Sequence, residues 1–303
     1  MAEQVAGGRE DLALRPFLLA YLEPTSPLQH SAAAIRKLLM MADRGLPLVY
    51  APGPVEGASA PVTSAGSLAM ANAEVLSGLT LAQLRRPGTP CVYGSGSGPL
   101  DMRTMVATYT SPEFLLHCQA MAELGHRFYH LPVWGFAGCT DSKIPDLQAG
   151  IESALWVLWA ALGGANLVHD VGYVESGLTG SLEMMAINDE IIGFVRRLTG
   201  GIAITPETLA IDAIDEVGHR AGWVTAAHTM RHYREVWYPR IFDRRAFHAW
   251  EAAGRTDATA RARGVVKDLL ARHTPVPLPA GTHDTLRAIV AEADARVEIA
   301  VGR

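Results

Sequence analysis

Short apolar runs alternate with longer segments of helical spacing along the first two thirds of the chain. Each run is apolar at consecutive positions, which is typical of strands that helices cover on both faces. The predicted strands are 17–22, 46–50, 90–93, 131–136 and 166–171, with 201–204 as a candidate sixth. Repeated strand–helix units of this kind predict a parallel sheet.

Helix signals fill the intervals between these runs. The spacing predicts helices over 31–44, 67–84, 145–162 and 178–198, and a further helix that begins near Ser111. Gly45 is a predicted C-terminal cap. Ser111, Pro112 and Glu113 provide a hydroxyl cap, a proline at the first helical position and an early acid.

The pattern changes at Thr205, after which only helix signals occur. Residues 243–253, 256–273 and 282–301 read as charged, amphipathic helices. We therefore expect a disordered or linker N-terminus over 1–13, a β/α portion over 14–204, and a helical region over 205–303 packed on it.

Two architectures contain such parallel strands, the open doubly wound sheet and the (β/α)8 barrel. A closed barrel needs eight strands, and the pattern supplies five or six. Either some strands escape detection or the chain holds only part of a barrel.

Composition narrows the class of protein. The 303 residues are 49% hydrophobic and 19% charged, which is typical of a globular chain. The net charge of −5 predicts no nucleic-acid partner. The most apolar run, 151–162, is shorter than the roughly 20 residues of a membrane span. Three scattered cysteines fit reduced thiols, so we expect a cytoplasmic protein without membrane contact.

Polar and ionisable residues gather just after the predicted strands, at 53–58, 94–103, 138–143 and 169–175. In parallel α/β proteins the functional site lies at the carboxyl ends of the strands. These four turns are therefore the predicted site.

Several simple motifs are weaker. The glycines at 94, 96 and 98 do not form G-x-G-x-x-G, and a flexible turn is preferred over a phosphate cradle. His228 and His232 could present two metal ligands from one helix face, but no acidic motif accompanies them in the sequence. Surface or capping histidines are preferred, and no metal site is predicted.

Cys139 follows a predicted strand and has ionisable neighbours. Lys143 would lower the pKa of its thiol, whereas Asp141 would raise it. A lone cysteine is more often inert packing than a nucleophile, so the turn alone leaves both roles open.

Longer motifs carry a resemblance. The turn Gly138-Cys139-Thr140-Asp141-Ser142-Lys143 is followed by Pro145-Asp146, Gln148-Ala149-Gly150 and Glu152. Other motifs are Asn72-Ala73-Glu74-Val75-Leu76, Glu175-Ser176-Gly177-Leu178-Thr179, Asp189-Glu190-Ile191 and His228-Thr229-Met230-Arg231-His232. In this order, over 14–273, they resemble the trimethylamine methyltransferase (MttB) family.

The resemblance implies a fold and an activity. The fold is an α/β, (β/α)8 TIM-barrel type, incomplete at the N-terminus if the family's upstream part is missing, with a helical C-terminal appendage. The activity is methyl transfer from an amine to the Co(I) corrinoid (cobalamin) of a partner protein, so no cofactor is bound permanently. We also expect a homo-oligomer.

The founding members carry pyrrolysine in the turn that matches 138–143. Here Cys139 matches that residue, with Gly138 and Thr140 as alternative matches, so the chain resembles the branch that uses quaternary amines such as glycine betaine. Cys139 and Asp141 are the predicted catalytic residues. The strand-end position predicts substrate contacts from Trp134, Phe136, Lys143, Asp170, Tyr173, Glu175, His228 and Arg231.

Two alternatives remain from the sequence. The first is a truncated, non-catalytic homologue that retains small-molecule binding or a subunit interface. The second is an unrelated barrel enzyme such as a decarboxylase, which would not explain the ordered motifs.

Overall fold

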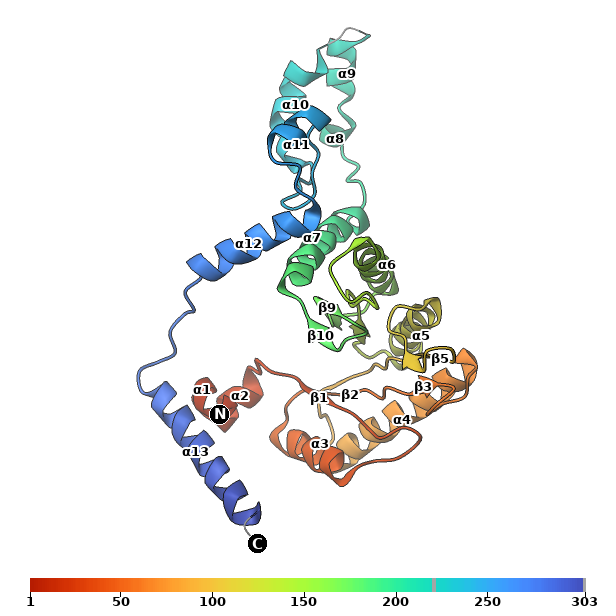
Figure 1. Cartoon of the computed structure of the whole chain (residues 1–303), viewed down its shortest axis with the longest axis vertical. Helices are drawn as coiled ribbons and strands as arrows, with labels where there is room; N and C mark the ends of the chain where they lie inside the picture. Colours follow the sequence, from red (N-terminus) through yellow and green to blue (C-terminus); the bar gives the residue numbers. More distant parts are fainter. Residues whose placement is uncertain (220–221, 302–303) are drawn as a thin grey trace. The chain divides into compact units, whose positions relative to one another are not determined.

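The computed structural model describes residues 1–219 and 222–301 (Figure 1). The chain divides into two compact units. The first unit comprises Met1–Phe136, Gly163–His169 and Leu269–Arg303. The second comprises Ala137–Leu162 and Asp170–Asp268. The predicted boundary between residues 204 and 205 lies inside the second unit, and the predicted 205–303 region includes residues outside the described part.

Parallel strands form the centre of the first unit. Strand β2 (Leu48–Tyr50) lies between β1 (Ala20–Leu22) and β4 (Cys91–Val92), and Leu48 pairs with both Ala20 and Cys91. Strand β7 (Trp134–Phe136) pairs in parallel with β8 (Leu167–His169). An isolated parallel bridge between Tyr93 and Val133 connects the two sheets.

The predicted strands are thus mostly confirmed. Five predicted runs contain β1, β2, β4, β7 and β8, in the order of the chain. The prediction of a candidate strand over 201–204 is wrong, because these residues are irregular and exposed. They follow a helix that ends at Thr199, and no strand among the described residues pairs with them.

A mixed α/β class is what the structure supports. In the described residues the sheets contain two or three strands each, and no closed eight-stranded barrel is shown. The small strands β3 (Val55–Glu56), β5 (Gly98–Asp101) and β6 (Val106–Ala107) form another sheet, and β9 (Tyr173–Val174) pairs with β10 (Thr179–Gly180). The two-residue strands are too short to show a periodicity, and β5 contains a glycine, a proline and an aspartate, so the pattern did not predict any of them.

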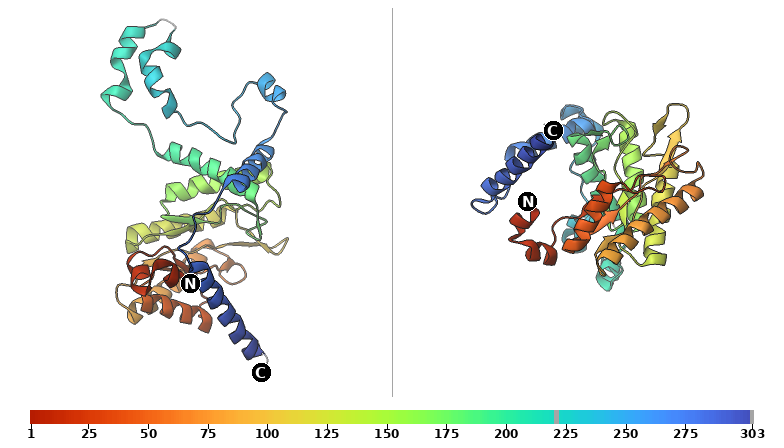
Figure 2. Two further views of the ribbon diagram at one scale, coloured as in Figure 1. Left: turned by 90° about the vertical axis from the view of Figure 1, so that its left-hand side faces the viewer. Right: turned by 90° about the horizontal axis from the view of Figure 1, so that it is seen from below.

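Helices α3 (Ala32–Arg44) and α4 (Ser64–Arg85) pack on β1 and β2 (Figure 1). Figure 2 shows these two helices, in red-orange and orange, from two further sides. Gly45 ends α3 with a φ of 66°, as predicted, and the Ser31 hydroxyl caps the other end of the helix by accepting the Ala34 N–H.

The other helices of this unit are α1 (Ala2–Ala6), α2 (Arg9–Leu14), α5 (Pro112–Glu123) with the π-helix η1 (Leu124–Tyr129), and α13 (Thr282–Val301). Residues 1–13, predicted as disordered or linker, are largely helical. Leu12 is buried in the core together with Leu38 and Tyr50, and this apolar burial explains the order of the segment.

Two long helices, α6 (Leu147–Gly163) and α7 (Leu182–Thr199), contribute ten buried residues to the second unit. The remaining elements are α8 (Pro206–Leu209), α9 (Ile211–Val217), η2 (Trp223–Thr225), α10 (Ala227–His232), η3 (Tyr233–Glu235), α11 (Phe247–Ala252) and α12 (Ala258–Arg272). No helix among the described residues combines the length and apolarity that crossing a membrane requires.

Candidate functional site

The turn after β7 buries a cysteine among carboxylates. The Cys139 side chain is fully buried, and this burial raises the pKa of its thiol to about 12. The negative charges of Asp170, Asp141 and Glu152 raise it further. Cys139 is therefore a neutral thiol at neutral pH, and a neutral thiol is a poor nucleophile.

A glutamate on α6 holds this turn in place. Glu152 Oε2 accepts hydrogen bonds from the Thr140 hydroxyl at 2.5 Å and from the Asp141 N–H at 2.9 Å. The Gly138 carbonyl accepts further bonds from Asn188 and Ser153. The sequence motif contains Glu152 but does not predict these hydrogen bonds, because the partners of Glu152 lie in a preceding loop.

The segment 170–176 contains unusual backbone. Asp170, Glu175 and Ser176 adopt φ values of 76°, 56° and 53°, in the left-handed region that residues other than glycine rarely occupy. Such conformations persist only when surrounding bonds impose them, and they are frequent at functional sites.

Hydrogen bonds join this segment to the cysteine turn. The Ser176 hydroxyl donates to Asp141 Oδ1 at 2.8 Å. The backbone N–H groups of Glu175 and Ser176 donate to the carbonyls of Ser142 and Thr140, at 2.7 and 3.0 Å. We name residues 138–143 and 170–176 together the acidic loop cluster.

The cluster brings together six of the predicted site residues. Cys139, Asp141 and Asp170 are close enough to interact electrostatically. The Tyr173 carbonyl accepts the Thr140 N–H at 3.1 Å, and the Tyr173 side chain is exposed. Glu175 is exposed and accepts the Thr179 hydroxyl, while Lys143 donates to the Asp141 carbonyl at 2.8 Å.

Trp134 and Phe136 belong instead to the first unit. Their rings lie 4.7 and 4.3 Å from the His169 ring, between centroids, and Tyr21 joins them at 5.7 Å from His169. The two predicted aromatic side chains therefore surround a histidine, and their predicted contact with substrate stays a prediction.

His228 and Arg231 lie on α10, where they contact α8. His228 Nε2 lies 3.2 Å from the Glu207 backbone oxygen, and Arg231 donates to the Glu207 carboxylate at 3.1 Å. His232 Nε2 lies 3.1 Å from the same carboxylate. The structure thus supplies the acidic neighbour that the sequence did not show beside these histidines.

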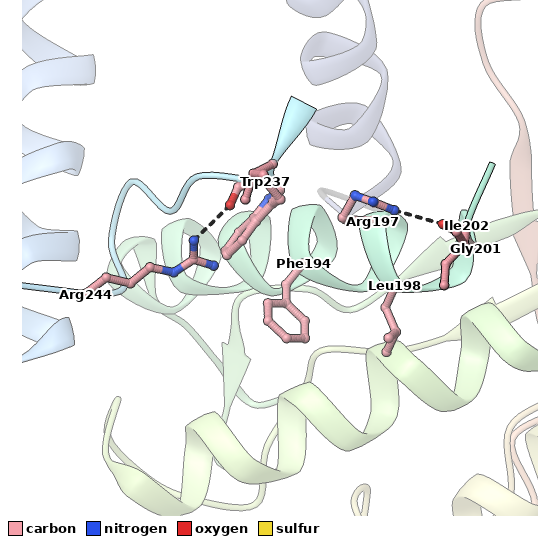
Figure 3. A pocket seen from close by; sticks show the side chains of 8 residues that line it. Phe194, Arg197, Leu198, Gly201, Ile202, Trp237 and Arg244 are labelled. Atoms are coloured by element: carbon pink, nitrogen blue, oxygen red, sulfur yellow. Dashed lines mark hydrogen bonds between the residues drawn. The ribbon is translucent and has the colours of Figure 1, made fainter. Parts of the chain in front are cut away.

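A separate apolar pocket of about 620 Å³ lies in the second unit (Figure 3). The Phe194 and Trp237 rings meet edge to face in it, at 5.3 Å between centroids, and the Arg244 guanidinium lies over Trp237. None of the predicted site residues lines this pocket. Arg197 and Arg244 donate to the backbone carbonyls of Gly201 and Trp237 (Figure 3).

Comparison with known proteins identifies the family of this chain. The family model described as trimethylamine methyltransferase (MTTB) matches residues 1–298. A trimethylamine methyltransferase MttB of Desulfitobacterium hafniense is 38% identical over 294 residues, which is 97% of this chain and 59% of that protein. A trimethylamine methyltransferase MttB of Methanosarcina barkeri is 36% identical over 288 residues, 95% of this chain and 58% of that protein.

A third relative has a name that gives a different substrate. A glycine betaine methyltransferase of Desulfitobacterium hafniense is 33% identical over 288 residues, covering 94% of this chain and 60% of that protein. The chain thus spans about three fifths of the length of the relatives it matches. Because the family model covers nearly the whole chain, the chain belongs to the trimethylamine methyltransferase family.

Proposed function

We propose that this chain takes part in corrinoid-dependent methyl transfer from a quaternary amine, such as glycine betaine, to the Co(I) corrinoid of a partner protein. Family membership and the name of the glycine betaine relative support a methyltransferase. The observation that carries the proposal is the acidic loop cluster, whose Asp141 and Asp170, together with Glu152 on α6, place negative charge near the buried, neutral Cys139 thiol. Such a site attracts a cation and offers no competing thiolate.

The proposed reaction requires little proton transfer by the protein. A quaternary ammonium loses a methyl group and leaves as a neutral tertiary amine, so no proton moves at the nitrogen. The partner-borne corrinoid supplies the strong Co(I) nucleophile. The acidic loop cluster fits this reaction, because its carboxylates suit an amine cation. This chain has only to bind and orient the substrate.

Individual residues of the cluster then have distinct roles. The Asp141 and Asp170 carboxylates attract the ammonium group. The exposed Tyr173 ring can add a cation–π contact of about 0.5–1 kcal/mol. Lys143, whose side chain is exposed beside Asp141, is placed to pair with a substrate carboxylate.

The hydrogen bonds that fix the turn contribute orientation. Glu152 and Ser176 lock Asp141 from two sides, so its carboxylate is positioned before the substrate arrives. Preorganisation of this kind lowers the barrier of a displacement in which donor and nucleophile must be in line.

We further propose a cytoplasmic homo-oligomer whose sheets belong to a (β/α)8 barrel.

The test measures methyl transfer to photoreduced cob(I)alamin, and the loss of the Co(I) absorption spectrum reports the reaction. The donors are glycine betaine, carnitine, proline betaine, choline and trimethylamine. Turnover with a quaternary donor is the expected result. No turnover with any donor from a folded chain would overturn the proposal in favour of a non-catalytic homologue, and turnover with trimethylamine alone would overturn the substrate class.

A single substitution tests the role of the cluster. Asp141→Asn removes one charge at similar size, and we expect kcat/KM for the quaternary donor to fall at least tenfold, about 1.4 kcal/mol of transition-state binding. Asp212→Asn is the matched control, since Asp212 is an exposed acid on α9. Equal kcat/KM values for both variants would contradict a substrate role for Asp141.

A further inference from the structure

The segment from α8 to η3 has little to hold it together. Its elements are three to seven residues long, and none of them buries a residue. Helices this short are unstable alone in water, because nucleation costs more than the few hydrogen bonds return. Small scaffolds without a core commonly depend on a cross-link such as a bound metal.

Three side chains converge at the point where α8 meets α10. Glu207, His228 and His232 each offer one ligand atom, and these atoms all lie within 4.8 Å of one another. Glu207 Oε1 and His232 Nε2 are 3.1 Å apart, and the two imidazole rings lie 4.4 Å apart between centroids. A tetrahedral ion binds each ligand atom at about 2.0–2.2 Å, and the ligand atoms around it are then separated by distances comparable to those between the ligand atoms of Glu207, His228 and His232.

The surroundings of the cluster suit a metal ion in two further ways. His232 Nδ1 lies 2.7 Å from the Glu235 carboxylate, so His232 has an acceptor that orients its ring, as metal-binding histidines usually do. His228 also lines a hollow of about 210 Å³ with Glu216 and Thr225, which gives a fourth ligand or a small molecule room beside the cluster.

We propose that Glu207, His228 and His232 form a binding site for a divalent transition-metal ion of the zinc type, which joins α8 to α10. Two imidazoles and one carboxylate are a ligand set that zinc uses in open, exchangeable sites. Arg231 shares the Glu207 carboxylate, and its exposed side chain can leave when the ion binds. This site is separate from the acidic loop cluster and does not depend on the proposed methyl transfer.

The test uses the full chain, stripped of metal with EDTA and dialysed. Zn²⁺ binding is measured by competition with a chromophoric chelator, and Co²⁺ is used for its visible ligand-field spectrum. We expect one ion per chain. Affinity should fall at least 100-fold in His228→Ala, His232→Ala and Glu207→Gln, and about tenfold in Glu235→Gln, whose role is positioning. His219→Ala, in the same segment but outside the cluster, should bind as the parent does.

A second readout keeps the proposal testable if a variant is poorly folded. Hydrogen exchange in the parent should slow over residues 205–217 and 223–235 when Zn²⁺ is added, and His232→Ala should not respond. Zn²⁺ binding of equal affinity in the parent and in the three ligand variants, or protection that persists in His232→Ala, would overturn the site and leave an ion-pair cluster only.

Discussion

At the scale of single residues, burial decides which groups of this protein carry charge. Cys139 and His117 are both almost completely buried, and each is kept neutral by loss of water. The neighbours differ, since carboxylates lie near the thiol, whereas His117 faces the Ser95 hydroxyl at 3.4 Å. Each neutral group leads to a separate prediction.

Replacing Cys139 with alanine should leave methyl transfer largely intact. A thiol whose pKa is about 12 is protonated at neutral pH and supplies no nucleophile. The measurement is kcat/KM for the quaternary donor in parent and variant. A loss above tenfold, with unchanged circular dichroism, would show that the thiol takes part.

Acid should destabilise the protein partly through His117. Its folded pKa is lowered to about 4 by burial, so the stability it contributes is present above its unfolded pKa near 6.5 and is lost as pH falls toward 4. The stability lost in this way amounts to about 3 kcal/mol. Urea unfolding of the parent and of His117→Gln at pH 7 and pH 4 measures it, and equal losses in the two proteins would contradict the assignment.

At the scale of elements, helix α7 organises the chain that follows it. Glu190 on α7 is 2% exposed, and its Oε1 accepts the backbone N–H groups of Arg240, Ile241 and Phe242 at 2.8, 3.1 and 3.2 Å. One carboxylate thus caps three successive amides of a segment that has no regular structure. The family motif around Glu190 therefore has a structural role in this chain.

Glu190→Ala should destabilise the second unit by about 3 kcal/mol, because three buried donors lose a charged acceptor. Asp189→Ala is the control on the same helix, since Asp189 forms an exposed ion pair with Arg240 that should contribute less than about 1 kcal/mol. Urea unfolding followed by tryptophan fluorescence compares the two. Equal midpoints for the two variants would show that the cap contributes little.

At the scale of the whole molecule, the described sheets have open edges. In the described residues β8 pairs only with β7, and its Leu167 and Val168 are 44% and 42% exposed. An apolar strand with an unpaired edge is a template for pairing with another chain. The homo-oligomer expected from the sequence stays a prediction, and this edge is where we expect a second copy to pair.

We therefore expect the chain to elute as a species larger than a monomer. Val168→Lys should shift it toward the monomer, because a charge on an edge strand opposes pairing. Ile151→Lys, an exposed apolar position on α6, is the control and should leave the mass unchanged. Light scattering after size exclusion gives the masses, and a monomeric parent would contradict the prediction.

Sequence alone determined the longer apolar strands, several helix ends and the family. The strand predicted over 46–50 and the caps predicted at Gly45 and Ser111 follow from short-range preferences, so the predicted pattern and the structure agree there. The long motifs around 138–152 identified the family that the comparison shows. The positions of Cys139, Asp141 and Asp170 just after predicted strands, rather than the motifs, predicted that they lie near one another, because turns after parallel strands share one edge of a sheet.

Only the tertiary structure decided which distant side chains meet. Glu207 lies beside His228 and His232, and Glu152 reaches Thr140, although no local spacing predicts either contact. The neutral state of Cys139 also depends on burial and on charges from another segment. Sequence patterns report short-range preferences, whereas burial and electrostatics depend on distances that exist only once the chain has folded.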